Sequence, residues 1–260
     1  MENTLKPSFS PGAAANRTET GWQLRIPPGG KNLYRLAQLD DYAGLPRRHF
    51  LHSPPWIFSL RAKLSAPDLP GTWGFGLWND PFGSLIGFGD KARLLPVLPN
   101  AAWFFYGSRQ NWLSLHARIP GNGFFAGTIT SAAIPTVLLT PCFFLLPLLV
   151  IKPFSRLLRK MACKVVRQDA VAISADVTKW HEYSLDWLRE SVEFYIDGVS
   201  ILKTPISPNT PLGLAIWVDN QFAAWTSRGS LSFGTLANSS AWMEIEAISI
   251  KEIPLSIPPG

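Results

Sequence analysis

Apolar and polar residues alternate in stretches on both sides of the middle of the chain. Residues 57–66 alternate, and within 181–187 the side chains of Tyr183, Leu185 and Trp187 recur at every second position. Residues two apart on a strand point to the same face, so these runs predict half-buried β-strands.

The second half of the chain adds a hairpin and two more strands. Val192, Phe194 and Ile196 share one face of a strand, and Asp197-Gly198 is typical of a tight turn between two strands. The segment 211–225 divides between two faces, and 241–253 predicts the closing strand. One face holds Leu212, Leu214, Ile216 and Val218, and the other holds Ala215, Trp217 and Asp219. Short strands, Gly/Pro turns and little helical periodicity predict an antiparallel β-sandwich.

A long apolar segment interrupts this pattern, with no charged residue between Arg118 and Lys152. Its central part, 128–151, is long enough to cross a bilayer, for which about 20 apolar residues suffice. Three prolines disfavour a straight helix, namely Pro135, Pro141 and Pro147. A single crossing would also divide the predicted sandwich between two sides of a membrane. We therefore expect a segment that dips into the membrane and returns, or lies in its interface. The alternative is a buried helical hairpin that caps the sandwich or pairs two subunits.

The charges are concentrated directly after this segment. Residues 152–167 hold six basic side chains and no acid, while the formal net charge of the whole chain is +6. At helical spacing the segment has an apolar stripe, formed by Phe154, Leu157, Leu158, Met161 and Val165. Such a helix is typical of an anchor on an anionic membrane surface, and its basic flank favours the cytoplasmic side. Because the basicity is local, we expect no nucleic-acid partner.

The N-terminal residues contain no apolar run typical of a secretory signal, which agrees with a cytoplasmic location. The residues predicted to attach the chain to the membrane come from the apolar segment and from the basic helix. They are Phe143, Phe144, Leu145, Leu148, Arg156, Arg159, Lys160 and Lys164.

Three stretches together resemble glycoside hydrolase family 16, within the concanavalin A-like lectin/glucanase superfamily. They are FSLRAKLSAPDLPGTWGFGLWNDP (58–81), WHEYSLDWLRESVEFYIDGVSILKTP (180–205) and WMEIEAISI (242–250). The resemblance covers roughly 35–127 and 170–253, and 180–198 is its most specific part. It implies an all-β, concanavalin A-like jelly-roll sandwich with a ligand on the concave face. The apolar and helical segment would then be a membrane-associating insertion.

This resemblance gives a division of the chain into four parts. Residues 1–20 are expected to be a flexible tail, 21–127 and 169–260 the two parts of the sandwich, and 128–168 the insertion.

The resemblance also implies a catalytic motif, which the sequence lacks. The family carries its catalytic carboxylates on one strand, as E-x-D-x-E or E-x-D-x-x-E. After Trp78 the chain offers only Asp80 and Asp90 before the next strands. Glu244 and Glu246 share a face, but they lie in the terminal strand, where a solvated strand face is the expected role. No catalytic residue, metal site or cofactor is therefore predicted.

A Trp-rich binding face is what the sequence then indicates, because indoles stack on sugar rings and nearby polar groups orient hydroxyls. The candidate ligand-binding residues are Trp73, Trp78, Asn79, Asp80, Trp103, Trp217, Asp219, Asn220 and Trp225.

Three functions follow from these observations. The first is a membrane-associated, non-catalytic binding or accessory module for a sugar, glycolipid or lipid-like ligand. The second is a glycosidase with a displaced carboxylate pair drawn from Asp80, Asp90 and Asp219. The third is a structural subunit of a membrane complex, which docks through its apolar segment.

Overall fold

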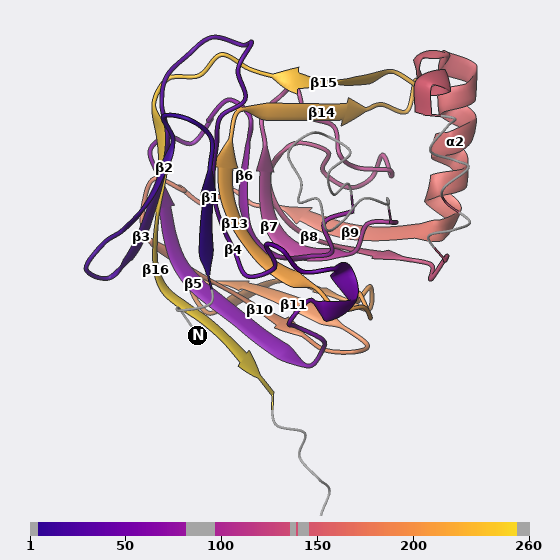
Figure 1. Cartoon of the computed structure of the whole chain (residues 1–260). Helices are drawn as coiled ribbons and strands as arrows, with labels where there is room; N and C mark the ends of the chain where they lie inside the picture. The colour runs from indigo at the N-terminus through magenta and orange to yellow at the C-terminus, as the bar shows by residue number, and fades with distance from the viewer. Residues whose placement is uncertain (1–4, 82–96, 136–138, 140–145, 254–260) are drawn as a thin grey trace, which may run out of the picture.

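The computed structural model describes residues 5–81, 97–135, 139 and 146–253. Two seven-stranded antiparallel sheets pack face to face, and a two-stranded hairpin and one longer helix lie to one side (Figure 1). Sheet A contains, in spatial order, β1 (Lys6–Phe9), β4 (Leu36–Asp40), β13 (Gly213–Asp219), β6 (Thr72–Trp78), β7 (Ala101–Gly107), β8 (Gly123–Ser131) and β9 (Val166–Ala172). The all-β sandwich predicted from the alternation is confirmed.

Sheet B holds the remaining long strands. Its spatial order is β12 (Val199–Thr204), β11 (Val192–Ile196), β10 (His181–Trp187), β5 (Trp56–Leu64), β16 (Ala241–Glu252), β3 (Gly21–Ile26) and β2 (Ala14–Arg17). The β14–β15 hairpin (Gln221–Trp225 and Leu231–Thr235) stands apart from both sheets. The described residues also include the 3₁₀ segments η2 (Arg47–His49) and η4 (Leu146–Val150), and the helix α2 (Lys152–Val165).

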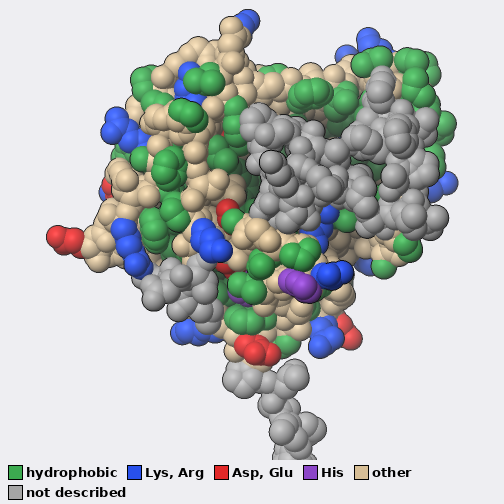
Figure 2. Space-filling view, in the orientation of Figure 1, with side chains coloured by type: hydrophobic (Ala, Val, Ile, Leu, Met, Phe, Trp, Pro, Cys, Tyr) green, Lys and Arg blue, Asp and Glu red, His purple; other side chains and the backbone are tan. Residues whose placement is uncertain are grey.

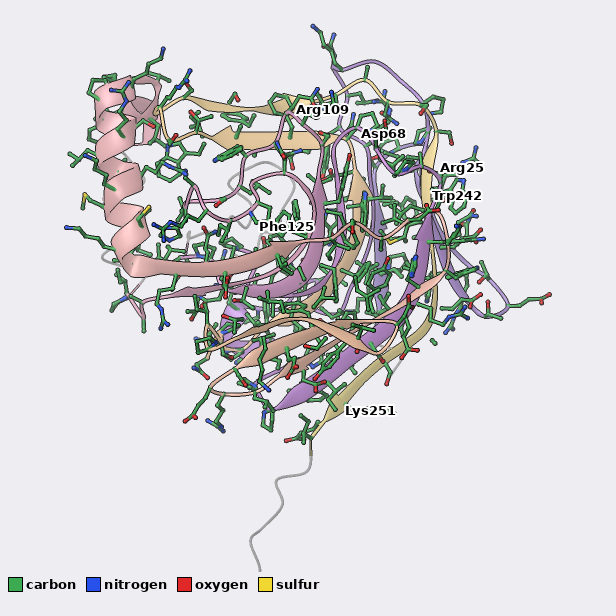
Figure 3. All side chains as sticks on the ribbon, turned by 180° about the vertical axis from the view of Figure 1, so that it is seen from behind. Arg25, Asp68, Arg109, Phe125, Trp242 and Lys251 are labelled. Carbon is green, nitrogen blue, oxygen red and sulfur yellow. The ribbon has the colours of Figure 1, made fainter. Side chains whose placement is uncertain are left out.

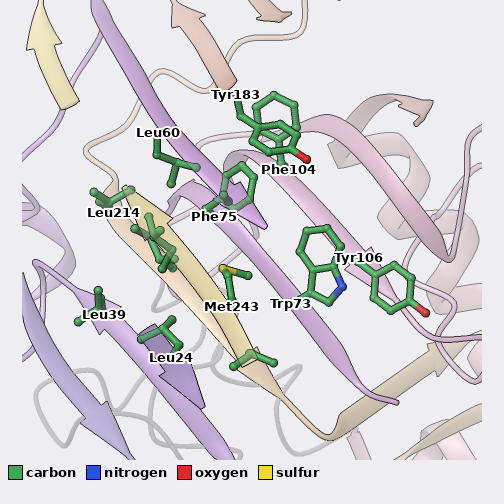
Figure 4. Close-up of a cluster of buried hydrophobic side chains, with 14 of the residues drawn as sticks. Leu24, Leu39, Leu60, Trp73, Phe75, Phe104, Tyr106, Tyr183, Leu214 and Met243 are labelled. Carbon is green, nitrogen blue, oxygen red and sulfur yellow. The ribbon is translucent and has the colours of Figure 1, made fainter. Parts of the chain in front are cut away.

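The core lies between the two sheets and follows the predicted alternation. In β13 it is Leu214, Ile216 and Val218 that point inward, against the inward side chains of β6 and β10. Figure 4 shows the aromatic part of this core, where the ring centroids of Phe75 and Tyr183 are 4.9 Å apart. A one-residue shift would move every side chain of a strand to the other face, so this burial fixes the register.

The predicted hairpin turn at Asp197-Gly198 is confirmed. Both residues have positive φ, 50° and 77°, as the tight turn that connects twisted strands requires. The Asp197 carboxylate also accepts a hydrogen bond from the Glu182 backbone amide at 2.9 Å. The turn is thereby tied to the neighbouring strand β10.

The prediction of a flexible tail over residues 1–20 is wrong for most of that range. Lys6–Phe9 pairs with β4 at the edge of sheet A, and Ala14–Arg17 pairs with β3 at the edge of sheet B. These edge strands have largely exposed side chains, so they lack the apolar alternation of a buried strand. Backbone pairing with a neighbouring strand holds them instead.

The predicted limits of the insertion, 128–168, are also wrong. Strand β8 continues to Ser131 and strand β9 begins at Val166, and these two residues pair directly. The backbone amide of Ala132 donates to the Val165 carbonyl at 2.8 Å, which closes the ladder. Residues 133–164 therefore connect two adjacent antiparallel strands. No helix within the described residues is long and apolar enough to span a membrane.

Candidate functional site

The outer face of sheet A carries a cluster of aromatic side chains, which we call the aromatic row: Trp78, Trp103, Phe105, Phe125 and Trp217. Figure 1 shows that the strands of this sheet curve, so that this face is concave toward the hairpin and α2. The indoles are half-buried, whereas Phe105 and Phe125 are almost fully buried beside them. Ring centroids along the row are separated by 5.0 to 6.0 Å.

Two glycines of β6 make room for the indoles of the neighbouring strands. A Cβ atom on Gly74 would lie 2.6 Å from the Trp217 ring, and one on Gly76 would lie 2.7 Å from Cβ of Trp103. Gly76 also has a φ of 147°, which larger residues rarely adopt. In the sequence Trp-Gly-Phe-Gly-Leu-Trp, the side chains of Trp73, Phe75 and Leu77 therefore point into the core. On the opposite face, Gly74 and Gly76 have no side chain and leave space for the neighbouring indoles.

Hydrogen bonds fix two of the three indoles in place. Nε1 of Trp78 donates to the Tyr42 hydroxyl at 2.7 Å. Nε1 of Trp217 donates to Oγ1 of Thr72 at 3.0 Å, and that hydroxyl donates to Oδ1 of Asp219 at 2.8 Å. The rings are thus held before any ligand arrives, which lowers the entropy cost of binding.

Asp219 lies on the predicted face but is buried, and its role is to support Trp217. Its carboxylate also accepts from the backbone amides of Thr72 and Gln221, both at 3.1 Å, and from the Tyr34 hydroxyl at 3.3 Å. Burial raises the pKa of Asp219 to about 6, although the hydrogen bonds from Thr72, Gln221 and Tyr34 act in the opposite direction.

This raised pKa predicts a specific pH dependence of stability. The folded state binds the Asp219 proton more tightly than the unfolded chain, so this contribution is fully present at low pH and is lost as pH rises through about 6. Between pH 5 and pH 7 the wild-type protein should lose ~1 kcal/mol of unfolding free energy relative to Asp219→Asn. Chemical denaturation of both proteins at each pH measures the difference, and a variant with the same pH profile as wild type would contradict the assignment.

The predicted placement of Trp73 on the ligand face is wrong. Its side chain is fully buried in the core, where the ring stacks on Tyr106 with centroids 5.3 Å apart (Figure 4). Trp73 shares strand parity with Phe75 and Leu77, and the opposite parity belongs to Gly74 and Gly76. The alternation of large residues with glycine was the signal that could have placed it correctly.

The two predicted asparagines are buried and support loops. Oδ1 of Asn79 accepts from the Asn100 amide at 3.0 Å, and its Nδ2 donates to the Leu98 carbonyl at 2.9 Å. Asn220 is fully buried, and its side-chain amide bonds to three backbone groups of two neighbouring loops. Their predicted role in ligand binding is not supported by this placement, because their polar atoms already have backbone partners.

Asp80 is buried and Trp225 contacts helix α2, so neither residue belongs to the aromatic row. Asp80 is buried with a φ of 44°, and its carbonyl accepts from the Arg47 guanidinium at 2.9 Å. The Trp225 indole donates to Oγ of Ser155 at 2.8 Å, so helix α2 packs on it. Asp90 lies outside the described residues. Trp78, Trp103 and Trp217 are therefore the candidate residues that the structure brings together.

Sequence reasoning missed Phe105 and Phe125. Strand β7 reads Ala-Ala-Trp-Phe-Phe-Tyr-Gly, and Ala101, Trp103 and Phe105 share the outer face at strand spacing. Phe125 lies opposite Phe105 on β8 and continues the row (Figure 3). The outer face of this strand therefore holds one methyl group and two aromatic rings, and no acid.

Several acidic and histidine residues outside the aromatic row have structural partners. Glu244 and Glu246 pair with Lys63 and Arg61 at 2.8 and 3.0 Å on the exposed face of sheet B, as expected of a solvated strand. His52 and Asp41 form a buried contact of 2.6 Å that sequence reasoning missed, since the two residues lie in different segments. No group of His, Cys, Asp and Glu suited to a metal ion occurs among residues 5–81, 97–135, 139 and 146–253.

Helix α2 lies against the edge of this site. Its inner face consists of Ser155 and Arg159, which are buried. The Arg159 guanidinium donates to the carbonyl of Ser114 at 2.6 Å and to the carbonyl of Trp225. The prediction that Arg159 faces lipid is therefore wrong, because the helix uses this residue to dock onto the protein. Phe143, Phe144 and Leu145 lie outside the described residues.

The other sides of α2 are exposed. Leu157 and Met161 are 54% and 55% exposed, and Leu148, Val150 and Ile151 of the preceding segment are also exposed. Basic side chains occupy the remaining side of the helix, namely Arg156, Lys160 and Lys164. Figure 2 shows hydrophobic and basic side chains mixed at this end of the molecule.

The sequence and the structure were compared with those of known proteins. No family model and no curated protein sequence matches the chain. Solved structures do match. A glycoside hydrolase family 16 protein of the Bacteroides ovatus mixed linkage glucan PUL, in complex with a product, has a TM-score of 0.50 at 10% identity, covering 96% of each chain.

A second match is the glycoside hydrolase family 16 endo-glucanase from Bacteroides ovatus, with a TM-score of 0.50, 11% identity and 96% coverage of each chain. A legume lectin-like domain from Entamoeba histolytica has a TM-score of 0.48 and 10% identity, with 96% of this chain and 91% of that chain covered. The protein thus has the concanavalin A-like jelly-roll fold of the family 16 structures, as the sequence resemblance implied.

Proposed function

We propose that the protein is a membrane-associated binding module that holds a sugar ring on the aromatic row and does not hydrolyse glycosidic bonds. The observation that carries this proposal is strand β7, which presents Ala101, Trp103 and Phe105 to the concave face. Half-buried indoles provide flat apolar surfaces on which the C–H face of a sugar ring can stack.

The acids of this face support a role in binding. Retaining glycoside hydrolysis requires two carboxyl groups about 5–5.5 Å apart that both reach the substrate. Asp219 is buried, and its carboxylate accepts bonds from Thr72, Gln221 and Tyr34. Asp40 on β4 is also buried, and its two oxygens accept from Gln38 and from the Ala43 amide. The carboxylates of both acids are hydrogen-bonded within the protein, so they stabilise the sheet and are not directed toward a sugar ring on the aromatic row.

Helix α2 supports the membrane part of the proposal. Its docked inner face leaves Leu157 and Met161 exposed, and Lys160 and Lys164 are exposed next to them. An apolar side next to a basic side is what a helix lying in the interface of an anionic membrane requires. The same charges favour the cytoplasmic face. A subunit of a membrane complex would use this surface against protein instead.

Ring binding is tested by truncating the indoles of the aromatic row. Trp103→Ala and Trp217→Ala should each weaken binding of a soluble mixed-linkage β-glucan oligosaccharide about tenfold, because a stacked indole contributes on the order of 1.5 kcal/mol. Isothermal titration of the full chain in detergent measures this. Trp242→Ala is the matched control, since Trp242 lies on the outer face of sheet B, where its ring contacts Lys63.

Two results would contradict the proposal. Equal loss in the Trp242 control would show that the effect is not local to the aromatic row. Release of reducing ends from the glucan, abolished in Asp219→Asn, would show that the protein is a glycosidase with a displaced acid.

A further inference from the structure

A depression lies beside the aromatic row, on the outer face of sheet A between β7, β8, β9 and the loop that follows β7. It is open and shallow, and its volume of about 320 Å³ includes open solvent. Half of its twelve lining residues are large apolar ones, and four are polar: Ser114, Thr128, Gln168 and Asp169. The large apolar residues are Trp103, Leu113, Ile119, Pro120, Phe125 and Ile129. It is therefore a continuation of the aromatic row toward the edge of the sheet.

Small residues create the floor of this depression. Gly127 on β8 pairs with Trp103 on one side and with Ala170 on the other. A Cβ atom on Gly127 would lie 3.0 Å from Cβ of Ala170, so the two backbones and one methyl group leave the floor low. Phe125, two residues before Gly127, closes one end, and its centroid is 5.4 Å from that of Phe105 in the row.

The outer wall of the depression is fastened to helix α2 and strand β9. The Leu115 amide donates to Oε1 of Gln168 at 2.8 Å, and the Ser114 carbonyl accepts from Arg159 at 2.6 Å. The wall is thus held in place by the same helix that exposes Leu157 and Met161.

We propose that this depression binds the alkyl chain of an amphiphile whose sugar headgroup stacks on the aromatic row. This inference rests on the proposed function and names its ligand class, a glycolipid or alkyl glycoside. The apolar side chains of the lining suit an alkyl chain, and Trp103 and Phe125 belong both to the lining and to the aromatic row, so one ligand can occupy both surfaces.

Alkyl glucosides of different chain length test this directly. Methyl, hexyl and octyl β-glucoside are titrated, below their micelle concentrations, into the full chain held in an uncharged nanodisc. Wild type should bind more tightly with each added methylene, by about fourfold for each one that becomes buried. Ala170→Leu fills the floor of the depression and should remove this gain while leaving the affinity for methyl glucoside unchanged.

The matched control is Ala172→Leu, which makes the same change two residues further along β9, on the same face and outside the lining. It should keep the gain with chain length. A gain that persists in Ala170→Leu, or no gain in wild type, overturns the inference, and the proposed ring binding still stands if methyl glucoside binds.

The proposed function can also fail separately. If no glucoside binds, octyl phosphocholine is compared with glycerophosphocholine in the same three proteins. A gain from the octyl chain that only Ala170→Leu removes supports the alkyl site without the sugar, and the absence of such a gain overturns it.

Discussion

Replacing residues 133–164 by Asn-Gly should leave a folded sandwich that no longer sediments with membranes. The segment connects two strands that already pair, Ser131 with Val166, and the Ala132 amide continues the ladder to the Val165 carbonyl. Asn-Gly forms the two-residue turn that joins twisted antiparallel strands, so β8 and β9 can become an ordinary hairpin. The deleted part contains the whole apolar surface of η4 and α2.

The cost of this deletion to the fold should be small. The Trp225 indole and the carbonyls of Ser114 and Trp225 lose their partners on α2, but they become accessible to water at the same time. Thermal unfolding should therefore remain cooperative, while flotation with anionic vesicles should fall to the level of a protein without an anchor. A variant that aggregates or unfolds without cooperativity would show that α2 completes the sandwich.

A deletion made at the limits expected from sequence serves as the comparison. Joining Gly127 to Arg167 removes Thr128–Ser131, the end of β8, together with Val166 of β9. This variant should be less stable than the Asn-Gly variant, because β7 loses the partners of Ala101 and Ala102 at its edge.

The sequence predicted those parts of the fold in which one strand face is apolar and the other is not. The register of β10, β11 and β13 followed from parity alone, since a slip would expose Leu214, Ile216 and Val218. The edge strands β1 and β2 could not be found in this way. Their side chains are mostly exposed on both faces, and only pairing with β4 and β3 makes them strands.

The sequence could not predict where strand β8 ends within the continuous apolar segment. Residues 128–131 have the composition of the apolar segment that follows them, yet they belong to β8. The residues that pair with them, Val166 to Asp169, come 35 to 41 residues later in the sequence. Partners that are distant in sequence also explain why the predicted role of Asn79 and Asn220 in ligand binding is not supported. Each lies next to a predicted site residue, but its amide is used by a distant loop that sequence order does not reveal.

Helical periodicity divided α2 into two sides, whereas the structure gives it three. Leu157 and Met161 are exposed, as are Lys160 and Lys164, but the buried side consists of Ser155 and Arg159 and faces the protein. Nothing in the spacing distinguishes Arg159 from Lys160, since a docked arginine and a lipid-facing arginine have the same sequence signature. Arg159 is docked because it donates to the carbonyls of Ser114 and Trp225, and these carbonyls belong to other segments of the chain.

This difference between basic residues of one helix predicts opposite results for their substitution. Lys160 and Lys164 are exposed, so Lys160→Gln combined with Lys164→Gln should weaken binding to anionic vesicles about 30-fold at low salt, given about 1 kcal/mol for each charge near the surface. The loss should shrink at physiological ionic strength, where charges are screened over about 8 Å, and the unfolding free energy should stay unchanged.

Arg159→Gln should do the reverse. The shorter neutral side chain leaves the buried Ser114 carbonyl without its partner, so the unfolding free energy should fall by about 2 kcal/mol while vesicle binding of the folded protein changes little. The control for net charge is Lys31→Gln combined with Lys251→Gln. Both lysines are exposed, and Lys251 lies in β16 at the end of the molecule away from α2 (Figure 3). Vesicle binding that falls equally in this control would show that total charge, and not α2, directs the protein to the membrane. If Arg159→Gln weakens vesicle binding without loss of stability, the docked position of α2 is wrong.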